Sequence, residues 1–474
     1  MDSFGRSFAG ALALVAGSLV PFAADVARAA VFQVNSTLDG DDPNPNGICD
    51  AAPPAGICTL RAALRESQNQ VFDDDILVPA GVIMISGSTI FLGGAGGHVT
   101  IQGAGHASTR IRNVPGRSGL FIEADGWLRM RDLSIEQFTT SGDGAAIRTF
   151  GYSSAERCAF VSNSAGLDGG SISGGDGAAI ELIDVAFAYG HAGRHGGEID
   201  LNGSSTLSCL RGIFEGASAV DDGGAIYLDP NAGGVIADSL FAGNESQENG
   251  GAIAADSQGQ RLRIVNSTFS GNRAWGSGGA LFIPYGRVDV YSSTIVGNTA
   301  DLDLDGIGDG GGAFFYVSAG SQLANSIVSG NASSVTISEG GLTLRWPEDC
   351  AGTVTSVGHN LIQNFFTGCG PGDNGCCLAS GSAPIQADPL LQPLLYNGSS
   401  TRTHAIGPGS PALNAGDPSG CDDGEASVLT LDQRGATRPA PGQGVCDLGA
   451  YEYGALLFGD DFDLWEWKWS AVAP

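Results

Sequence analysis

Lysine is almost missing from this chain, because Lys468 is the only one among 474 residues. With 22 basic and 51 acidic residues, the formal net charge is −29 at pH 7. Phosphate backbones and anionic membrane surfaces repel so acidic a protein, which argues against nucleic acid and such membranes as partners. The same charge is compatible with calcium binding, or with the solubility of a secreted protein.

Long apolar runs are also missing after the N-terminal segment. Within residues 1–29, Arg6 precedes an apolar, small-residue run from Ala9 to Ala23, and Ala27-Arg28-Ala29 matches a signal-peptidase site. No later run approaches the roughly 18 apolar residues of a membrane helix. We therefore expect a signal peptide at 1–29 and an exported mature chain, starting near Ala30, that has no transmembrane segment.

Helical periodicity is scarce outside the N-terminal region, whereas glycine is abundant, with 75 residues. Short segments between glycine-rich turns alternate apolar and polar residues, as in 261–264 (RLRI) and 287–290 (RVDV). This period of two predicts strands of about four or five residues. Glycine suits turns with positive φ. The sequence therefore predicts an all-β chain of short strands and tight turns.

Two apolar positions repeat together through the middle of the chain, mostly at intervals of 27 residues. The first follows a Gly-Gly motif and comprises Ile172, Ile199, Ile226, Ile253, Leu281 and Phe314. The second comprises Phe160, Phe187, Phe214, Phe241, Phe269, Ile295 and Val328. A fixed period of this size indicates a solenoid. Coils of three short strands, stacked about 4.8 Å apart, predict a right-handed parallel β-helix of the pectate-lyase-like type.

Asparagine stands three residues after the second apolar position in several coils, at Asn163, Asn244, Asn272, Asn298 and Asn331. Asn tolerates the left-handed conformation, and stacked side-chain amides can hydrogen-bond from one coil to the next. We therefore expect these five residues to form a structural ladder rather than a catalytic site.

Ten cysteines indicate an oxidising compartment. We expect Cys49 to pair with Cys58. Most of the six C-terminal cysteines should pair locally, namely Cys350, Cys369, Cys376, Cys377, Cys421 and Cys446. Cys209 shares an inward register with Ile236, so a buried thiol is predicted there. Cys158 lies about two coils from Cys209, roughly 10 Å, which is too far for an easy disulfide.

The sharpest local motif is an acidic insertion at 301–309 (DLDLDGIGD), where one repeat interval grows to 33 residues. Four acids match positions 1, 3, 5 and 9 of an EF-hand-type calcium loop, with glycine at position 6: Asp301, Asp303, Asp305 and Asp309. Gly312 replaces the bidentate Glu of that loop, so we expect weak affinity. The sequence predicts calcium as a cofactor, and a solvated acidic loop is the alternative.

A catalytic alternative rests on four residues near one turn: Arg194, His195, Asp221 and Asp222. Glycosidic cleavage needs paired carboxylates, or a cation with a basic residue, on one exposed face. However, Asp168, His195, Asp222, Asn249 and Ser277 all fill the same slot before Gly-Gly, which is typical of a turn position. We therefore expect a turn ladder, with a polysaccharide lyase or glycoside hydrolase as the alternative.

The N-terminal region and the repeat both resemble bacterial surface proteins. The segment 58–64 (CTLRAAL) is similar to the motif of the CSLREA domain, although Thr59, Ala62 and Leu64 depart from it. Its helical spacing predicts a short amphipathic helix that caps the open end of the solenoid. The alternation of GGAI with FVSN, FAGN and FSGN resembles the repeats of polymorphic outer-membrane proteins. That resemblance implies a β-helical adhesin.

Six ordered blocks resemble the choice-of-anchor Q module: GHNLI at 358–362, DPLL at 388–391, THA at 403–405, PGSPA at 408–412, DQRG at 432–435 and CDLGAYE at 446–452. The resemblance implies a C-terminal closing segment of a bacterial surface protein. The expected organisation is a signal peptide at 1–29, a CSLREA-like cap at 30–95, β-helix repeats at 96–345, a disulfide-containing choice-of-anchor Q-like module at 346–454 and an acidic, aromatic tail at 455–474.

These patterns predict an exported β-helix at the cell surface or outside the cell, with outer-membrane association as one option. Its expected role is an adhesin-like or structural binding scaffold for a polysaccharide or a cell-surface ligand. We expect a monomeric rod that binds no nucleic acid. The alternative is a carbohydrate-active lyase or hydrolase, which would need acid–base residues that converge on one outward face.

Overall fold

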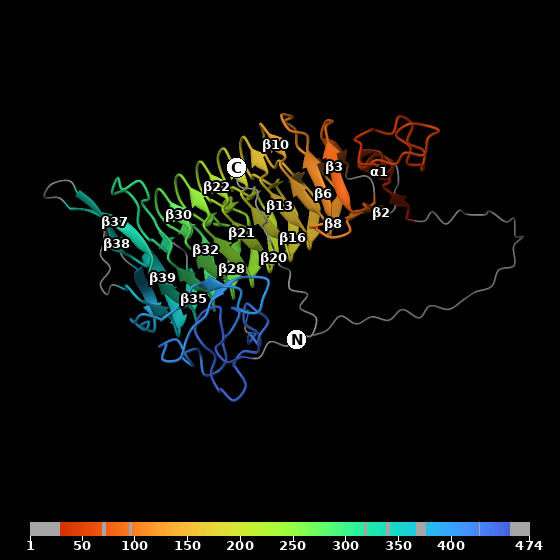
Figure 1. Ribbon diagram of the computed structural model, residues 1–474. Helices are drawn as coiled ribbons and strands as arrows, with labels where there is room; N and C mark the ends of the chain where they lie inside the picture. Colours follow the sequence, from red (N-terminus) through yellow and green to blue (C-terminus); the bar gives the residue numbers. More distant parts are fainter. Residues whose placement is uncertain are drawn as a thin grey trace, which may run out of the picture.

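The computed structural model describes residues 29–68, 73–93, 97–316, 320–337, 342–365, 376–425 and 427–455. Over these residues the chain forms a right-handed parallel β-helix, as predicted (Figure 1). The predicted signal peptide up to residue 28, the tail beyond residue 455 and Cys369 lie outside the described residues.

One coil shows how the repeat is built. β15 (Ile172–Gly174) leads into β16 (Ala179–Ile183), β17 (Ala186–Ala188) and the two-residue β18 (His191–Ala192). Each strand pairs in parallel with its equivalent one coil later. A coil therefore has four strand segments where we expected three, because a two-residue strand is too short to leave an alternating pattern in the sequence.

The stacked coils form four ladders of parallel strands. The GGA ladder, whose strands follow the Gly-Gly motif in the regular coils, contains β4 (Ile90–Leu92), β7 (Ile122–Ala124), β11 (Ile147–Thr149), β15, β19 (Ile199–Leu201), β23 (Ile226–Leu228), β27 (Ile253–Ala255), β31 (Leu281–Ile283) and β34 (Ala313–Phe315). The long ladder contains β1 (Val31–Gln33), β2 (Asp74–Leu77), β5 (Val99–Gln102), β8 (Trp127–Arg131), β12 (Tyr152–Glu156), β16, β20 (Thr206–Leu210), β24 (Gly233–Ala237), β28 (Arg261–Val265), β32 (Arg287–Tyr291), β35 (Gln322–Ala324), β39 (Cys350–Gly358) and β41 (Cys376–Gly381).

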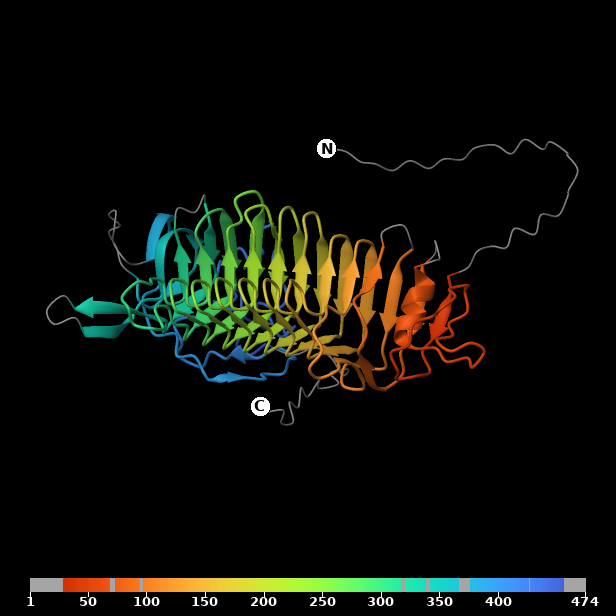
Figure 2. The same cartoon turned by 90° about the horizontal axis from the view of Figure 1, so that it is seen from above.

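The other two ladders complete each coil. The Phe ladder contains β3 (Gly81–Ile85), β6 (Thr109–Asn113), β9 (Ser134–Glu136), β13 (Ala159–Val161), β17, β21 (Ile213–Glu215), β25 (Leu240–Ala242), β29 (Thr268–Ser270), β33 (Thr294–Val296), β36 (Ile327–Ser329) and β40 (Leu361–Ile362). The short ladder contains β10 (Thr139–Thr140), β14 (Ser164–Ala165), β18, β22 (Ser218–Ala219), β26 (Glu245–Ser246) and β30 (Arg273–Ala274). An antiparallel hairpin of β37 (Ala332–Ile337) and β38 (Leu342–Pro347) extends from the later coils (Figure 2).

The interior of the rod is a stack of equivalent side chains. The phenylalanines of the Phe ladder lie face to face, with ring centroids 4.8 Å apart for Phe187 and Phe214 and 4.5 Å for Phe214 and Phe241. Beside them runs the predicted Asn ladder, in which the buried Asn244 Nδ2 donates to Asn272 Oδ1 at 2.9 Å and to Phe214 O at 3.0 Å. Stacking therefore buries the aromatic rings and satisfies the backbone of each turn together.

Each Gly-Gly motif serves two different needs. The first glycine has positive φ, +62° at Gly169 and +63° at Gly196, which other residues adopt at a cost in strain. The second glycine lies against the next coil, where a Cβ on Gly170 would come 2.0 Å from the carbonyl oxygen of Gly197. The repeat therefore requires glycine for conformation at one position and for close backbone approach at the next.

The N-terminal cap contains the predicted helix, α1 (Leu60–Ser67). Thr59 is its N-cap, since its Oγ1 accepts the backbone N–H of Ala62 at 3.0 Å. Leu60 and Leu64 are fully buried against the first coils. The predicted Cys49–Cys58 disulfide closes the loop before the helix. The helix thus covers core that the first coil would otherwise expose.

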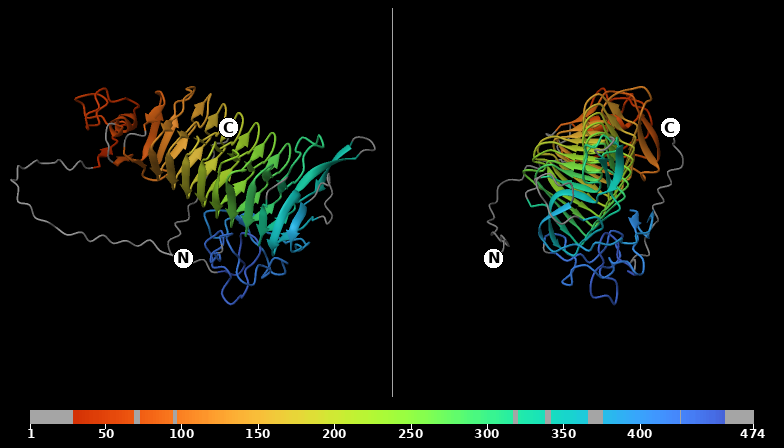
Figure 3. Two further views of the ribbon diagram at one scale, coloured as in Figure 1. Left: turned by 180° about the vertical axis from the view of Figure 1, so that it is seen from behind. Right: turned by 90° about the vertical axis from the view of Figure 1, so that its left-hand side faces the viewer.

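The C-terminal segment, residues 382–455, starts at the last coil and then lies along one side of the rod (Figure 3). It includes the hairpin of β42 (Leu394–Leu395) and β43 (Thr403–His404) and the disulfide Cys421–Cys446. Leu394 packs on outward apolar residues of the Phe ladder, including Ile213 and Leu240. The segment therefore covers a flank of the rod that would otherwise expose apolar surface.

The pairs Cys49–Cys58 and Cys421–Cys446 fit the predicted pattern, as do the two buried thiols. Cys158 and Cys209 are free and buried, and burial raises the pKa of both thiols to about 12. Cys350 is disulfide-bonded, in addition to the two pairs above. No helix among the described residues is long and apolar enough to cross a membrane.

Candidate functional site

The acidic insertion brings three of its four predicted ligands together. One carboxylate oxygen from each of Asp301, Asp303 and Asp305 lies within 4.8 Å of the other two. Burial, together with the nearby carboxyl of Asp303, raises the pKa of Asp301 to about 6. Asp309 does not join this group; its backbone N–H donates to Ser277 Oγ at 3.1 Å in the preceding coil.

The insertion is held at its start by Arg345 of β38. Its guanidinium donates to the carbonyl oxygens of Asp301 at 2.7 Å and Leu302 at 3.0 Å. The Asp301 carboxylate also accepts the backbone N–H of Asp305 at 3.1 Å, which folds the loop back on itself. Carboxylate oxygens are the donors that calcium prefers, and calcium takes six to eight oxygens, so water must supply the rest. The residues therefore fit a weak, partly hydrated calcium site.

A turn ladder occupies the slot before Gly-Gly, as predicted. In each step a side-chain atom accepts the backbone N–H of the slot residue one coil later. Asp168 accepts from His195 at 3.2 Å, and His195 Nδ1 accepts from Asp222 at 3.3 Å. The ladder comprises Asp168, His195, Asp222, Asn249, Ser277 and Asp309. Asp309 is the last member of this ladder through its backbone N–H, which fixes its backbone in the turn slot, outside the group of three carboxylates.

The four residues of the catalytic alternative do not form one constellation. Arg194 pairs with Asp168, and Asp222 accepts two hydrogen bonds from Asn249, from its backbone N–H at 2.9 Å and its side-chain amide at 3.0 Å. His195 and Asp221 approach each other, with Nε2 3.9 Å from Oδ2, beyond hydrogen-bond distance. Their contacts in the structure are mainly those of a turn.

Sequence reasoning missed the residues that face outward from the GGA ladder near this turn. Asp200 of β19 and Tyr227 of β23 are neighbours in register, and the Tyr227 ring stacks on His195 with centroids 4.4 Å apart. Asp200 is only 1% exposed, and burial, with Asp168 and Asp229 nearby, raises its pKa well above the ordinary value. The residue after each repeated apolar position points outward, and this simple rule would have identified both side chains.

Aromatic side chains continue the same row toward the last coils. Phe282 of β31 and Phe314 of β34 are in register, with ring centroids 5.5 Å apart. Tyr316, which is 55% exposed, lies 6.0 Å from Phe314. We use the name GGA face for the outward row of Asp200, Tyr227, Phe282 and Phe314. Among the described residues, the hydrogen bonds of the C-terminal segment to the rod fall on other ladders and the turns beside them.

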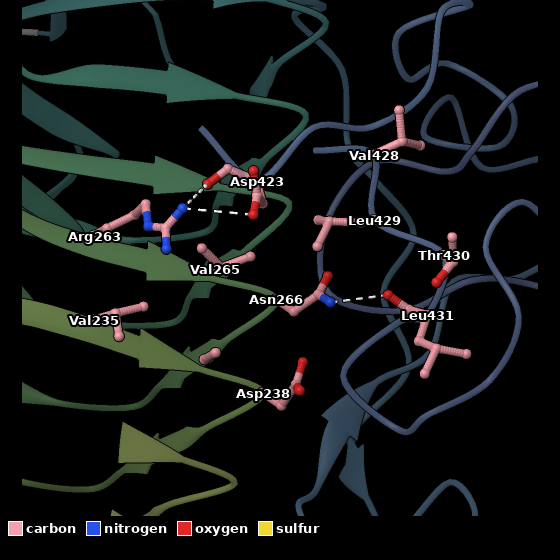
Figure 4. A pocket seen from close by; sticks show the side chains of 11 residues that line it. Val235, Asp238, Arg263, Val265, Asn266, Asp423, Val428, Leu429, Thr430 and Leu431 are labelled. Carbon is pink, nitrogen blue, oxygen red and sulfur yellow. Dashed lines mark hydrogen bonds and ion pairs between the residues drawn. The ribbon is translucent and has the colours of Figure 1, made fainter. Parts of the chain in front are cut away.

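A pocket of about 270 Å³ lies between the rod and the C-terminal segment (Figure 4). Arg263 donates to Asp423 O at 3.0 Å, and Asn266 Nδ2 donates to Leu431 O at 2.9 Å across it. Burial raises the pKa of Asp238, on the rod side, to about 7. Because Arg263 and Asn266 already bind the C-terminal segment, we interpret this pocket as part of a packing interface.

Comparison of the chain with protein-family models, with curated proteins and with solved structures finds no match in any of the three. The resemblances to the CSLREA domain, to polymorphic outer-membrane proteins and to the choice-of-anchor Q module therefore rest on their sequence motifs.

Proposed function

We propose that this protein is an exported, adhesin-like binding scaffold whose GGA face holds an extended polysaccharide. The observation that carries the proposal is the row of Asp200, Tyr227, Phe282 and Phe314 at outward positions along the rod axis, in which Asp200 is buried, the three rings are half-buried and Ala254 lies between Tyr227 and Phe282. Aromatic rings provide apolar surfaces for sugar rings, and polar groups between them fix orientation. Four coil steps of about 4.8 Å give the row a length of about 20 Å, which suits a polymer better than a small metabolite.

A location outside the cell or on its surface best suits this role. The disulfides Cys49–Cys58 and Cys421–Cys446 form in oxidising compartments. The signal-like segment at 1–29 and the resemblance of both ends of the chain to bacterial surface modules point the same way. We place the mature protein outside the cell or on its surface.

A binding experiment with immobilised neutral and acidic polysaccharides tests the GGA face. We expect the mature chain to bind at least one polymer, and the double variant Phe282→Ala/Phe314→Ala to lose most of that binding. Trp346→Ala, which removes an exposed ring on β38, is the matched control and should bind normally. Equal binding by the double variant and the wild type would refute the proposed face.

We also propose that calcium binds Asp301, Asp303 and Asp305 and stiffens the edge of this face. The insertion lies directly before β34, which carries Phe314. At a free calcium concentration of ten times Kd, a site of this kind stabilises the fold by about 1.4 kcal/mol. Thermal unfolding with calcium and with chelator should show this gain in the wild type and not in Asp303→Ala or Asp305→Ala. An identical midpoint under both conditions would leave the acids as a solvated loop.

A second candidate function, glycoside hydrolysis, is favoured by one observation. Asp200 is buried with a raised pKa among other carboxyl groups, and a protonated acid beside an ionised carboxylate is the pairing that hydrolysis needs. If the polymer is cleaved, new reducing ends should appear with the wild type and not with Asp200→Asn. Binding without release of reducing ends would assign the face to adhesion alone.

A further inference from the structure

A cleft of about 220 Å³ opens on the long ladder at the first coils, on a different ladder from the GGA face. Its central side chain is Trp127, which is 48% exposed. The Trp127 ring stacks on His98 with centroids 4.3 Å apart and packs against Tyr152 at 4.4 Å. Three rings from three successive coils therefore form a continuous aromatic row at the surface.

The register of the strands explains where the row ends. Tyr152 pairs with Trp127 on one side and with Ala179 on the other, so the next coil adds no ring. At the opposite end, His98 Nδ1 lies 3.3 Å from Asp73 Oδ1. Farther along the same ladder, Arg261 and Arg263 are covered by the C-terminal segment. The aromatic row thus lies on a part of the long ladder away from that covered region.

Two charged groups beside the rings have no hydrogen bond or ion pair with other described residues. These groups are the carboxylate of Asp75 and the guanidinium of Arg129, both of which line the cleft. Asp75 pairs in register with Thr100, and Thr100 with Arg129, so the two charges lie two coils apart, on the order of 10 Å. A buried or paired charge would have a structural role, whereas these two are open to a ligand.

The chemistry of the cleft selects the ligand. Asp73 and Asp75 repel an anionic ligand, and a cationic ligand would leave the Arg129 guanidinium without a partner. A neutral polyhydroxylated ring satisfies both ends, since hydroxyl groups donate to carboxylates and accept from guanidinium groups. Its apolar C–H groups can pack on the exposed edge of the Trp127 indole, whose two faces are occupied by His98 and Tyr152. We infer that this cleft is a binding site for one or two pyranose units of a neutral glycan.

This inference goes beyond the proposed function, because the cleft and the GGA face lie on different ladders and can fail separately. Calorimetry with neutral tetrasaccharides as probes (cellotetraose, xylotetraose and maltotetraose) tests it. We expect at least one to bind with Kd below about 1 mM. Trp127→Ala should weaken that binding at least tenfold, and the surface variants Arg129→Gln and Asp75→Asn severalfold each.

Two controls separate binding from folding and from the other face. Trp275→Ala removes a similarly exposed indole on another part of the rod and should leave binding unchanged. Phe282→Ala/Phe314→Ala should also leave tetrasaccharide binding unchanged. The inference is overturned if no tetrasaccharide binds at 10 mM, or if trigalacturonate or tetramethylammonium binds in its place. It is equally overturned if binding persists in Trp127→Ala, Arg129→Gln and Asp75→Asn.

Discussion

Two parts of the rod solve the same structural problem with different chemistry. From Asn244 to Asn331, successive coils place asparagine in one buried slot, and each amide bonds the next. Between Asn163 and Asn244, the slot holds Gly190 and Ala217 instead. At Gly190 the carboxyl group of Glu198 occupies the space, so that a Cβ on Gly190 would come 2.3 Å from the Glu198 carboxyl carbon.

The contacts of Glu198 replace those of the missing amide only in part. Glu198 is fully buried, and it accepts the Gly190 backbone N–H at 2.7 Å and the Ser171 hydroxyl at 2.6 Å. Ser171 in turn accepts from Asn163 Nδ2 at 3.2 Å, which links Glu198 to the ladder. Burial raises the pKa of Glu198 to about 8. An amide is neutral at every pH, whereas this carboxyl group titrates, so the two regions should respond differently to pH.

The largest expected effect comes from cutting the regular ladder at Asn272→Ala. The variant removes hydrogen bonds to Asn244, Asn298 and the carbonyl of Phe241, and leaves buried polar groups without partners. We expect a loss of about 4 kcal/mol in the free energy of unfolding, measured with urea. The control Asn249→Ala, in the half-exposed turn ladder, should lose about 1 kcal/mol because water replaces its bonds. Similar losses in both variants would contradict the difference in burial.

The second expected effect is a difference between the two regions in how the free energy of unfolding depends on pH. The folded pKa of Glu198, about 8, lies above its unfolded value, so folding favours the neutral acid. The stability that this preference provides is fully present below about pH 4.5 and is lost as pH rises through 8. Between pH 5 and pH 7.5 the loss through Glu198 is about 3 kcal/mol.

Glu198→Gln should remove that part of the pH dependence, as measured by urea unfolding across the same range. The control Glu425→Gln changes a mainly exposed carboxylate and should leave the slope unchanged. If Glu198→Gln and the wild type lose stability in parallel, the carboxyl group is not the titrating group.

Much of this architecture was predictable because the repeat keeps one residue type in one place. The Phe ladder, the Asn ladder and the turn slot each recur at the coil period. Because coils stack in register, residues one period apart in the sequence are in contact in the structure. The role of Glu198 was harder to predict, since it compensates for Gly190 eight positions away. The glycine at position 190 leaves a space that the side chain of Glu198, from a different repeat position, fills. This contact can be recognised only in the folded coil, where the two positions lie side by side.

The candidate sites show the same limit. The motif spacing correctly grouped Asp301, Asp303 and Asp305, but Asp309 belongs to the turn ladder, and a loop motif contains no information about the preceding coil. The cleft at Trp127 joins three coils before the regular repeat begins, where no clean register aligns His98 with Tyr152. The flank covered by the C-terminal segment likewise depends on outward apolar residues such as Ile213, which an inward-facing repeat does not single out.

Placing an asparagine at position 190, where the Asn ladder is interrupted, should have an intermediate effect on the free energy of unfolding. Glu198→Ala should destabilise the rod, because the Gly190 N–H and the Ser171 hydroxyl lose their partner. Adding Gly190→Asn should recover about 2 kcal/mol of that loss, since the nearest obstacle to a side chain at 190 is Glu198 itself. Urea unfolding of both variants at pH 6 checks this. No recovery in the double variant would show that the backbone at 190 cannot take part in the ladder.

The smallest expected effect comes from Ser171→Ala, which removes the hydroxyl that connects Asn163 of the Asn ladder to Glu198 and leaves both of those side chains in place. The hydroxyl of Ser171 stabilises the ionised form of Glu198, and its loss should raise the pKa of that carboxyl group further. We expect the loss of one hydrogen bond to cost about 1 kcal/mol at pH 5. The decline in stability should then extend to higher pH than in the wild type, because the carboxyl group stays neutral longer. In a Glu198→Gln background the same substitution should leave the pH profile between pH 5 and pH 8 the same as that of Glu198→Gln alone. A shift of the pH profile in that background would mean that Ser171 acts on another titrating group. The hydrogen bond from Ser171 to Glu198 would then not be the cause of the change in pH dependence.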